Sequence, residues 1–252
     1  MNYFAHNGNR ENMSTLIDIH SHILPAVDDG SDSWETTGQM LNSAYEDGID
    51  EIILTPHYKR QYSGGIGHVR EQFQQLQTIC EKQYPELRLH LGTEAMYETE
   101  LADKLARGDV LTMAGSQYIL LEYPPAIEYS LIRRSIKELM YIGRIPILAH
   151  VERYSCIRKN IEHIYELDDM GVLIQMNADS VLGKHGFGVK QFCKKLLSRQ
   201  MVSFVASDAH DACVRKPMLS AAAHKVAKKY GQDYADELFC INASRLLRGE
   251  KV

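Results

Sequence analysis

The feature that most restricts the fold of this chain is a regular alternation of short apolar runs with longer amphipathic stretches. The runs are rich in β-branched residues and have the length of buried strands, at residues 16–20, 52–55, 87–92, 118–122, 145–150, 172–176 and 203–206. Stretches with helical spacing lie between them, at 34–45, 69–84, 131–142, 161–170 and 187–197. Strands that alternate with helices predict a parallel sheet with right-handed crossovers, either closed into a barrel or open and doubly wound.

Seven such units favour a barrel slightly smaller than the eight-stranded type. A chain of 252 residues is long enough for one large α/β domain, and it has no glycine- or serine-rich linker and no internal repeat after Leu16. We therefore predict a single domain over residues 15–252, closed by helices within 217–248. Residues 1–14 are expected to form a flexible N-terminal extension.

The composition narrows the class of protein further. A content of 44% hydrophobic and 24% charged residues is typical of a soluble globular protein. The net charge of −5 argues against non-specific nucleic-acid binding as the main role, although it allows local basic patches. No stretch approaches the roughly 20 apolar residues of a membrane span, and residues 1–14 have no signal-peptide core. We therefore expect a cytoplasmic protein that is not embedded in a membrane.

Residues that bind metal ions recur where the predicted strands end. They are His20 and His22 after the first run, His57 after the second, Glu94 after the third, Glu122 at the end of the fourth, His150 at the end of the fifth, and Asp208 and His210 after the seventh. The carboxyl ends of barrel strands meet at one rim, so these side chains are expected to converge. A single histidine of this kind is more often a hydrogen-bonded structural residue, but the whole set predicts a metal centre.

Two adjacent carboxylates follow the first pair of histidines. Asp28 and Asp29 could serve a turn or a metal ion, and we select Asp29 as the ligand. Ser31 or Asp32 is the expected N-cap of the helix that begins near Trp34. The complete set is five histidines and four carboxylates, which is too many for one ion and suits two or three ions of manganese, iron or zinc.

A centre of several ions suits hydrolysis of a phosphoester, because adjacent ions activate water and neutralise the oxygens of a phosphoryl group. Such an enzyme also needs cationic side chains on the phosphate. Arg153 and Arg215 lie on the appropriate loops, and Lys59 and Arg60 are weaker candidates.

Several short motifs resemble those of a known superfamily. They are DIHSH at 18–22, LPAVDDG at 24–30, TPHY at 55–58, GTE at 92–94, LLE at 120–122, AHVERY at 149–154 and SDAH at 207–210. In this order and spacing they resemble the PHP (polymerase and histidinol phosphatase) superfamily over about residues 15–250. More narrowly, they are similar to its bacterial capsule and exopolysaccharide tyrosine-phosphatase branch, called CpsB-like or YwqE-like.

The resemblance implies a distorted (β/α)7 TIM-like barrel with a trinuclear centre that is commonly manganese-dependent. It assigns the nine residues named above as ligands: His20, His22, Asp29, His57, Glu94, Glu122, His150, Asp208 and His210. It also implies that Arg153 and Arg215 bind phosphate and stabilise the transition state or assist protonation of the leaving group. The implied substrate is the phosphorylated, tyrosine-rich tail of a membrane-associated bacterial kinase that controls polysaccharide export and chain length.

Four other functions are alternatives to this hypothesis. A cysteine-dependent phosphatase would use the C-x5-R match from Cys193 to Arg199, but that segment has helical composition rather than the glycine-rich backbone of a phosphate loop. The five cysteines also form no C-x-x-C pair that would indicate a cysteine zinc site. A small-molecule phosphatase of the same superfamily, such as a histidinol phosphatase, is the main alternative. A nuclease and a non-catalytic binding module are more distant ones.

Overall fold

The computed structural model describes residues 15–58 and 65–252 of the chain. The expected N-terminal extension at 1–14 lies outside the described residues, and so do Lys59 and Arg60.

The described residues form short parallel strands that curl around a common centre. Three of them make one sheet in the order β1 (Leu16–Ser21), β2 (Ile49–Leu54) and β4 (Arg88–Leu91). Six make the other, in the order β3 (His57–Tyr58), β5 (Glu94–Met96), β6 (Tyr118–Glu122), β7 (Ile145–Leu148), β8 (Leu173–Asn177) and β9 (Phe204–Ala206). The first and last strands meet where His22 N–H donates to the Ala209 carbonyl and Asp208 N–H donates to the His20 carbonyl, each at 2.8 Å. The predicted seven-unit barrel is confirmed as a curled parallel sheet.

The second and third predicted strands, at 52–55 and 87–92, are each followed by a short strand that was not predicted, so the described residues contain nine strands. The break between β2 and β3 falls at Pro56, which has no N–H to donate to a neighbouring strand. The break between β4 and β5 falls at Gly92, where an added Cβ would lie 3.1–3.3 Å from Met113 and Ile53. At both breaks the backbone changes direction, and His57 and Glu94 begin new short strands that pair with each other.

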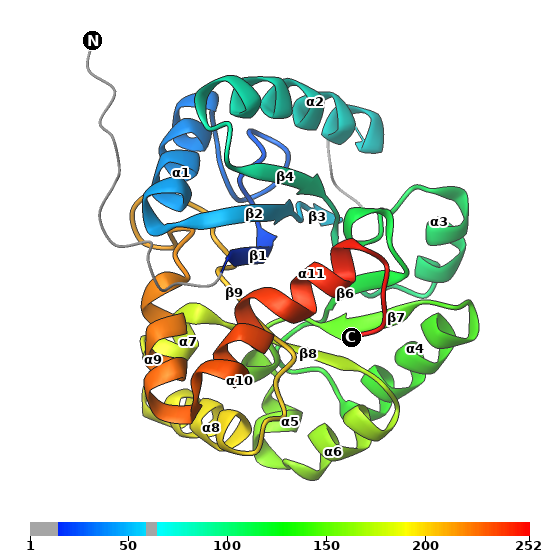
Figure 1. The fold of residues 1–252 in the computed structure, drawn as a ribbon. Helices are drawn as coiled ribbons and strands as arrows, with labels where there is room; N and C mark the ends of the chain where they lie inside the picture. The colour runs from blue at the N-terminus through cyan, green and yellow to red at the C-terminus, as the bar shows by residue number, and fades with distance from the viewer. Residues whose placement is uncertain (1–14, 59–64) are drawn as a thin grey trace.

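Helices surround the curled sheet (Figure 1). They are α1 (Trp34–Asp47), α2 (Gly65–Gln83), α3 (Leu101–Arg107), α4 (Tyr129–Tyr141), α5 (Ser155–Lys159), α6 (Glu162–Asp169), α7 (Ala178–Leu182), α8 (Phe187–Ser198), α9 (Ser220–Tyr230), α10 (Gln232–Asp236) and α11 (Asn242–Leu247), with a π-helical segment over Glu237–Ile241. The five predicted helices and the helical C-terminal region are confirmed. The short helices α3, α5 and α7 were not predicted, because five to seven residues are too few to show a helical period.

The predicted cap of α1 is wrong by one or two residues. Ser33 is the N-cap, and its Oγ accepts a hydrogen bond from Thr36 N–H at 3.2 Å. Ser31 is instead buried against Thr37, and Asp32 accepts a hydrogen bond from the Thr36 hydroxyl. The sequence Ser-Asp-Ser offers three capping residues in succession, and only the loop conformation selects one of them.

Two buried clusters pack on the two faces of the sheet. Ile19, Leu120 and Phe204 belong to the inner cluster, which α11 covers with Ala243 and Leu246. Figure 1 shows α11 crossing in front of the strands.

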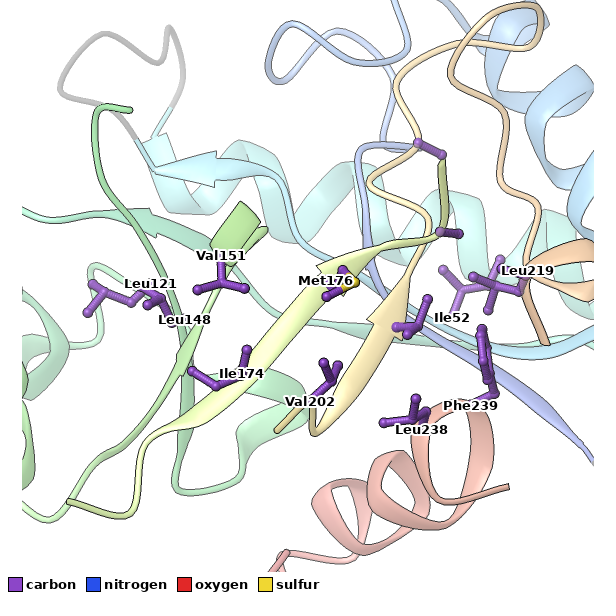
Figure 2. Close-up of a cluster of buried hydrophobic side chains, with 14 of the residues drawn as sticks. Ile52, Leu121, Leu148, Val151, Ile174, Met176, Val202, Leu219, Leu238 and Phe239 are labelled. Carbon is purple, nitrogen blue, oxygen red and sulfur yellow. The ribbon is translucent and has the colours of Figure 1, made fainter. Parts of the chain in front are cut away.

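The outer cluster joins the sheet to the surrounding helices. In Figure 2, Ile174 and Met176 lie two residues apart on β8, and Leu238 and Phe239 approach from the C-terminal helical segment. Because side chains alternate between the faces of a strand, the same short strands can bury both clusters and still present polar groups at their ends. None of the described helices is long and apolar enough to span a membrane.

Candidate metal centre

The predicted ligands converge at the carboxyl ends of the strands. Three sets have ligand atoms within 4.8 Å of one another: His22, His57 and His210; His20, His22, Glu94 and Asp208; and His57, Glu94 and Glu122. All members except Glu122 are buried, and the Glu122 side chain is only 13% exposed. The structure therefore brings together eight of the nine predicted residues, His150 included, and these sets could hold more than one ion.

Glu94 is the centre of this cluster. Its Oε2 lies 3.1 Å from His20 Nε2, 3.2 Å from His22 Nε2 and 3.0 Å from His57 Nδ1, and its Oε1 lies 2.9 Å from His150 Nε2. Burial by itself would raise the pKa of Glu94, but attraction to His20 and the hydrogen bond between His150 and Glu94 Oε1 hold this pKa well below its usual range. A carboxylate that is ionised and shared by four imidazoles can bridge adjacent cations.

The environment of the histidines is also suited to cations. Burial disfavours a charged His22, yet the Asp28 and Glu94 carboxylates raise its pKa to about 10. These two carboxylates therefore favour positive charge at the position of His22. Burial and the nearby charge of His22 lower the pKa of His210 to about 3, so that His210 is neutral and has a lone pair free for a metal ion.

The two adjacent aspartates after His22 have different positions. Asp28 is buried, its Oδ2 lies 2.7 Å from His22 Nδ1, and it accepts hydrogen bonds from the His57 and Gly30 backbone N–H groups. Asp29 lies at the rim with a 65% exposed side chain, and its Oδ1 is 3.4 Å from His57 Nε2. Asp28 thus orients a histidine in the manner of a carboxylate behind a metal ligand, whereas Asp29 can reach an ion beside His57.

Gly30 makes the turn around Asp28 possible. A Cβ at this position would lie 2.2 Å from the His22 carbonyl oxygen, closer than any side chain tolerates. The glycine therefore allows the loop to fold back so that Asp28 lies behind His22.

Arg153 and Arg215 meet at one carboxylate on the open side of the cluster. Their guanidinium Nη2 atoms lie 2.6 and 2.7 Å from Asp208 Oδ2, and their side chains are 35% and 36% exposed. Arg153 follows β7 in a 3-10 turn (Val151–Arg153), and Arg215 follows β9. Two cationic groups therefore border the buried cluster where solvent can reach it.

The donor set and its unsatisfied atoms fit bound cations. Among the described residues, His57 Nδ1, Glu94 Oε2 and Glu122 Oε2 are buried and make no hydrogen bond. Buried polar atoms without partners are costly, and a metal ion would satisfy them. The mixture of imidazole nitrogen and carboxylate oxygen suits manganese, iron or zinc better than magnesium or calcium.

Comparison with known proteins identifies the family. The model of the family described as "Capsular polysaccharide synthesis, CpsB/CapC" matches residues 16–248. The chain belongs to the CpsB/CapC family. This CpsB/CapC chain is 32% identical over 243 residues to the tyrosine-protein phosphatase CpsB of Streptococcus pneumoniae, covering 94% of this chain and 100% of that protein. It is 33% identical to the tyrosine-protein phosphatase YwqE of Bacillus subtilis, covering 94% and 93% of the two chains.

The structural comparison agrees. A crystal structure from work on YwqE of Bacillus subtilis and CpsB of Streptococcus pneumoniae superposes on this CpsB/CapC chain with a TM-score of 0.88 at 33% identity. The match covers 94% of this chain and 96% of the other, and those two proteins are described as metal-dependent tyrosine phosphatases.

Two residues of the CpsB/CapC site were missed because the sixth predicted strand contains no charged residue or histidine. Gln175 Oε1 accepts a 2.6 Å hydrogen bond from His150 N–H, and Gln175 Nε2 donates to Asn177 Oδ1 at 2.9 Å. Asn177 Nδ2 in turn donates to Asp208 Oδ2 at 2.7 Å. Polar side chains two residues apart in an otherwise apolar buried strand were the available signal.

The first and last strands of the CpsB/CapC sheet are also joined by a buried carboxylate. Asp18 accepts hydrogen bonds from the Ser207 backbone N–H and hydroxyl, and burial raises its pKa to about 6. Asp208, one residue further, has a φ of 53°, and His150 has a φ of 33°. Left-handed backbone at residues other than glycine costs on the order of 1–3 kcal/mol each and is concentrated at functional sites.

Replacing Asn177 with alanine is expected to weaken metal binding about 10- to 100-fold, because the amide holds Asp208 in place behind the cluster. Titration of metal-stripped protein with Mn²⁺ measures the change. Asn42→Ala is the matched control, since Asn42 donates a hydrogen bond to Glu46 on the exposed face of α1. Equal affinity in the Asn177 variant and the wild type would show that Asn177 has no positioning role.

Proposed function

We propose that this protein is a metal-dependent protein-tyrosine phosphatase. It hydrolyses phosphotyrosine on a bacterial tyrosine kinase that regulates capsule or exopolysaccharide synthesis. The observation that carries the proposal is Glu94 in contact with four histidines, next to two arginines that share Asp208, in a chain of the CpsB/CapC family. Similarity to CpsB and YwqE, both named tyrosine-protein phosphatases, supports the substrate class.

The proposed cofactor is two or three divalent ions, of manganese in the first instance, with iron or zinc as alternatives. His20, His22, Asp29, His57, Glu94, Glu122, His150, Asp208 and His210 are the proposed ligands. When bound, the ions supply a nucleophile from water and neutralise charge on the phosphoryl group.

The protein itself contributes the positioning of substrate and ligands. Arg153 and Arg215 present planar guanidinium groups that can hold the non-bridging phosphate oxygens and stabilise the charge that develops on them. The leaving group is a phenolate, whose conjugate acid has a pKa of about 10, so the reaction has little need of a strong general acid. Gln175, Asn177 and Asp28 keep the ligands in fixed orientations and do not contact substrate in this proposal.

The proposed partner is the tyrosine-rich tail of the kinase, and the proposed location is the cytoplasm, where ATP-dependent tyrosine phosphorylation takes place. The cysteine-dependent alternative is not supported. Cys193 is buried inside α8, burial raises the pKa of its thiol, and Arg199 lies beyond the end of the same helix. A thiol held in this way is a poor nucleophile.

Metal-stripped protein is expected to be inactive on a phosphotyrosine peptide and to recover activity when Mn²⁺ is added. Alkylation with iodoacetamide is expected to leave the recovered rate unchanged, because no thiol takes part. The same preparation is assayed on histidinol phosphate and on a single-stranded oligonucleotide, both of which are expected to react at least 100-fold more slowly. A preference for histidinol phosphate would establish the small-molecule alternative, and metal-loaded protein inert on all three substrates would favour a binding role.

A further inference from the structure

Positive charge is concentrated in one part of the chain. Residues 180–232 contain ten lysines and arginines but only two acidic residues, Asp208 and Asp211, although the whole chain has a net charge of −5. Asp208 is buried in the metal centre, and Asp211 accepts hydrogen bonds from the backbone N–H groups of residues 213–215. Neither carboxylate pairs with the lysines of α8 and α9, and these two helices contain no acidic residue.

These lysines form stripes on adjacent helices. On α8, Phe187, Lys190 and Lys194 follow one another at spacings of three and four residues and are exposed, with Phe187 77% exposed. On α9, Lys225 and Lys229 are four residues apart. The short helix α7 packs against both α8 and α9, and Figure 1 shows the three helices together at the lower left. We call Phe187, Lys190, Lys194, Lys225 and Lys229 the lysine face.

The two stripes converge over the end of α7. Lys225 Nζ donates hydrogen bonds to the carbonyls of Val181 and Leu182 at 2.9 and 3.2 Å. The stem of Lys190 lies against Gly183, where an added Cβ would be 3.0 Å from its Cδ. Lys190 and Lys225 therefore lie close together at the end of α7.

The charges of this face repel one another. Burial and the charges of Lys190, Lys229 and Lys194 lower the pKa of Lys225. No carboxylate in the described part of the chain forms an ion pair with Lys190, Lys194 or Lys229. A set of like charges without counter-charges raises the free energy of the isolated protein, and an anionic partner would remove that cost.

We propose that the lysine face binds peripherally to an anionic lipid surface. Its cations are all lysines, which act as point charges suited to a diffuse layer of lipid phosphates, whereas recognition of a single phosphate or carboxylate favours the planar fork of arginine. Phe187 continues the stripe of Lys190 and Lys194, and an exposed aromatic side chain beside lysines can enter the boundary between headgroups and acyl chains.

Cosedimentation with vesicles tests this surface without reference to phosphatase activity. The full chain is mixed with vesicles of phosphatidylcholine alone, or with about 30% of the anionic lipid phosphatidylglycerol added. We expect binding only to the anionic vesicles and release on raising the salt concentration. The triple variant Lys190→Ser, Lys194→Ser and Lys229→Ser is expected to bind on the order of 100-fold more weakly.

Two matched triple variants control for net charge and for fold. Lys82→Ser, Lys137→Ser and Lys159→Ser removes the same charge from exposed positions on α2, α4 and α5, and it is expected to bind like the wild type. Arginine at 190, 194 and 229 is expected to retain binding. Equal weakening by the two serine triples would overturn the proposal, and so would equal binding to neutral vesicles. Binding of the wild type to polyglutamate but not to anionic vesicles would overturn it in favour of an acidic protein partner.

Discussion

Replacing Glu94 with glutamine is expected to reduce metal-dependent phosphotyrosine hydrolysis on the order of 1000-fold. The substitution keeps the size of the side chain but removes the negative charge that four histidines contact. Removing one partner from a buried charge cluster raises its free energy by about 3–5 kcal/mol. In this site we expect that free energy to appear as weaker binding of the cations. Measurement of kcat/KM on a phosphotyrosine peptide, together with the metal content per chain, is expected to show both quantities falling.

Glu51→Gln is the matched control for this variant. Glu51 is on β2, where its carboxylate pairs with Arg88 and His90 of β4, away from the metal centre. Its substitution is expected to leave metal content and kcat/KM unchanged. If the Glu94 variant kept the metal content and the rate of the wild type, a central bridging role for Glu94 would be wrong.

Loss of either Arg153 or Arg215 is expected to cause the second largest fall in phosphotyrosine hydrolysis. Unlike Glu94→Gln, it is expected to affect the rate more than the metal content. Each alanine variant is expected to lower kcat/KM about 100- to 1000-fold, the usual cost of removing one preorganised donor to a developing negative charge. Metal content is expected to fall far less than the rate, because each variant leaves Asn177 and the other arginine in contact with Asp208 Oδ2. Assays of rate and metal content on one preparation separate this case from Glu94→Gln.

Conservative variants sharpen this second prediction. Lysine at 153 or 215 keeps the charge but loses the planar fork, so it is expected to recover only part of the activity. Arg133→Ala is the matched control, because Arg133 pairs with Glu166 on the outer surface of α4. Alanine variants that lose metal in proportion to their rate would show that the arginines support the cluster rather than the phosphate.

The convergence of the ligands could be predicted from the sequence because it depends on a simple geometric rule. Parallel strands of a barrel end at the same rim, so polar residues at strand ends such as His20, Glu122 and Asp208 meet whatever the details of the loops. The rule does not cover the loops, and their conformations could not be predicted from the sequence. Which of Asp28 and Asp29 faces His22 depends on the backbone of a single loop, in which Gly30 makes its close approach.

The other differences between the predicted and the observed structure also have local causes. Gln175 and Asn177 are neutral amides whose importance appears only through hydrogen bonds to residues of other strands. The break at Gly92 depends on close packing against Met113 and Ile53, which are distant in sequence, and the break at Pro56 depends on its missing N–H. The capping residue of α1 was misplaced because three adjacent residues have the required chemistry.

The seam between β1 and β9 has a consequence for biosynthesis. Asp18 and Ser207, which close it, are 189 residues apart, and His20 and Asp208 lie beside them. A ribosome must therefore have made most of the protein before the earliest and latest ligands can meet. Long-range closure of this kind slows folding, and a nascent chain halted before Ser207 lacks two of the nine proposed ligands, Asp208 and His210. The complete set of proposed ligands can therefore come together only when synthesis is nearly finished.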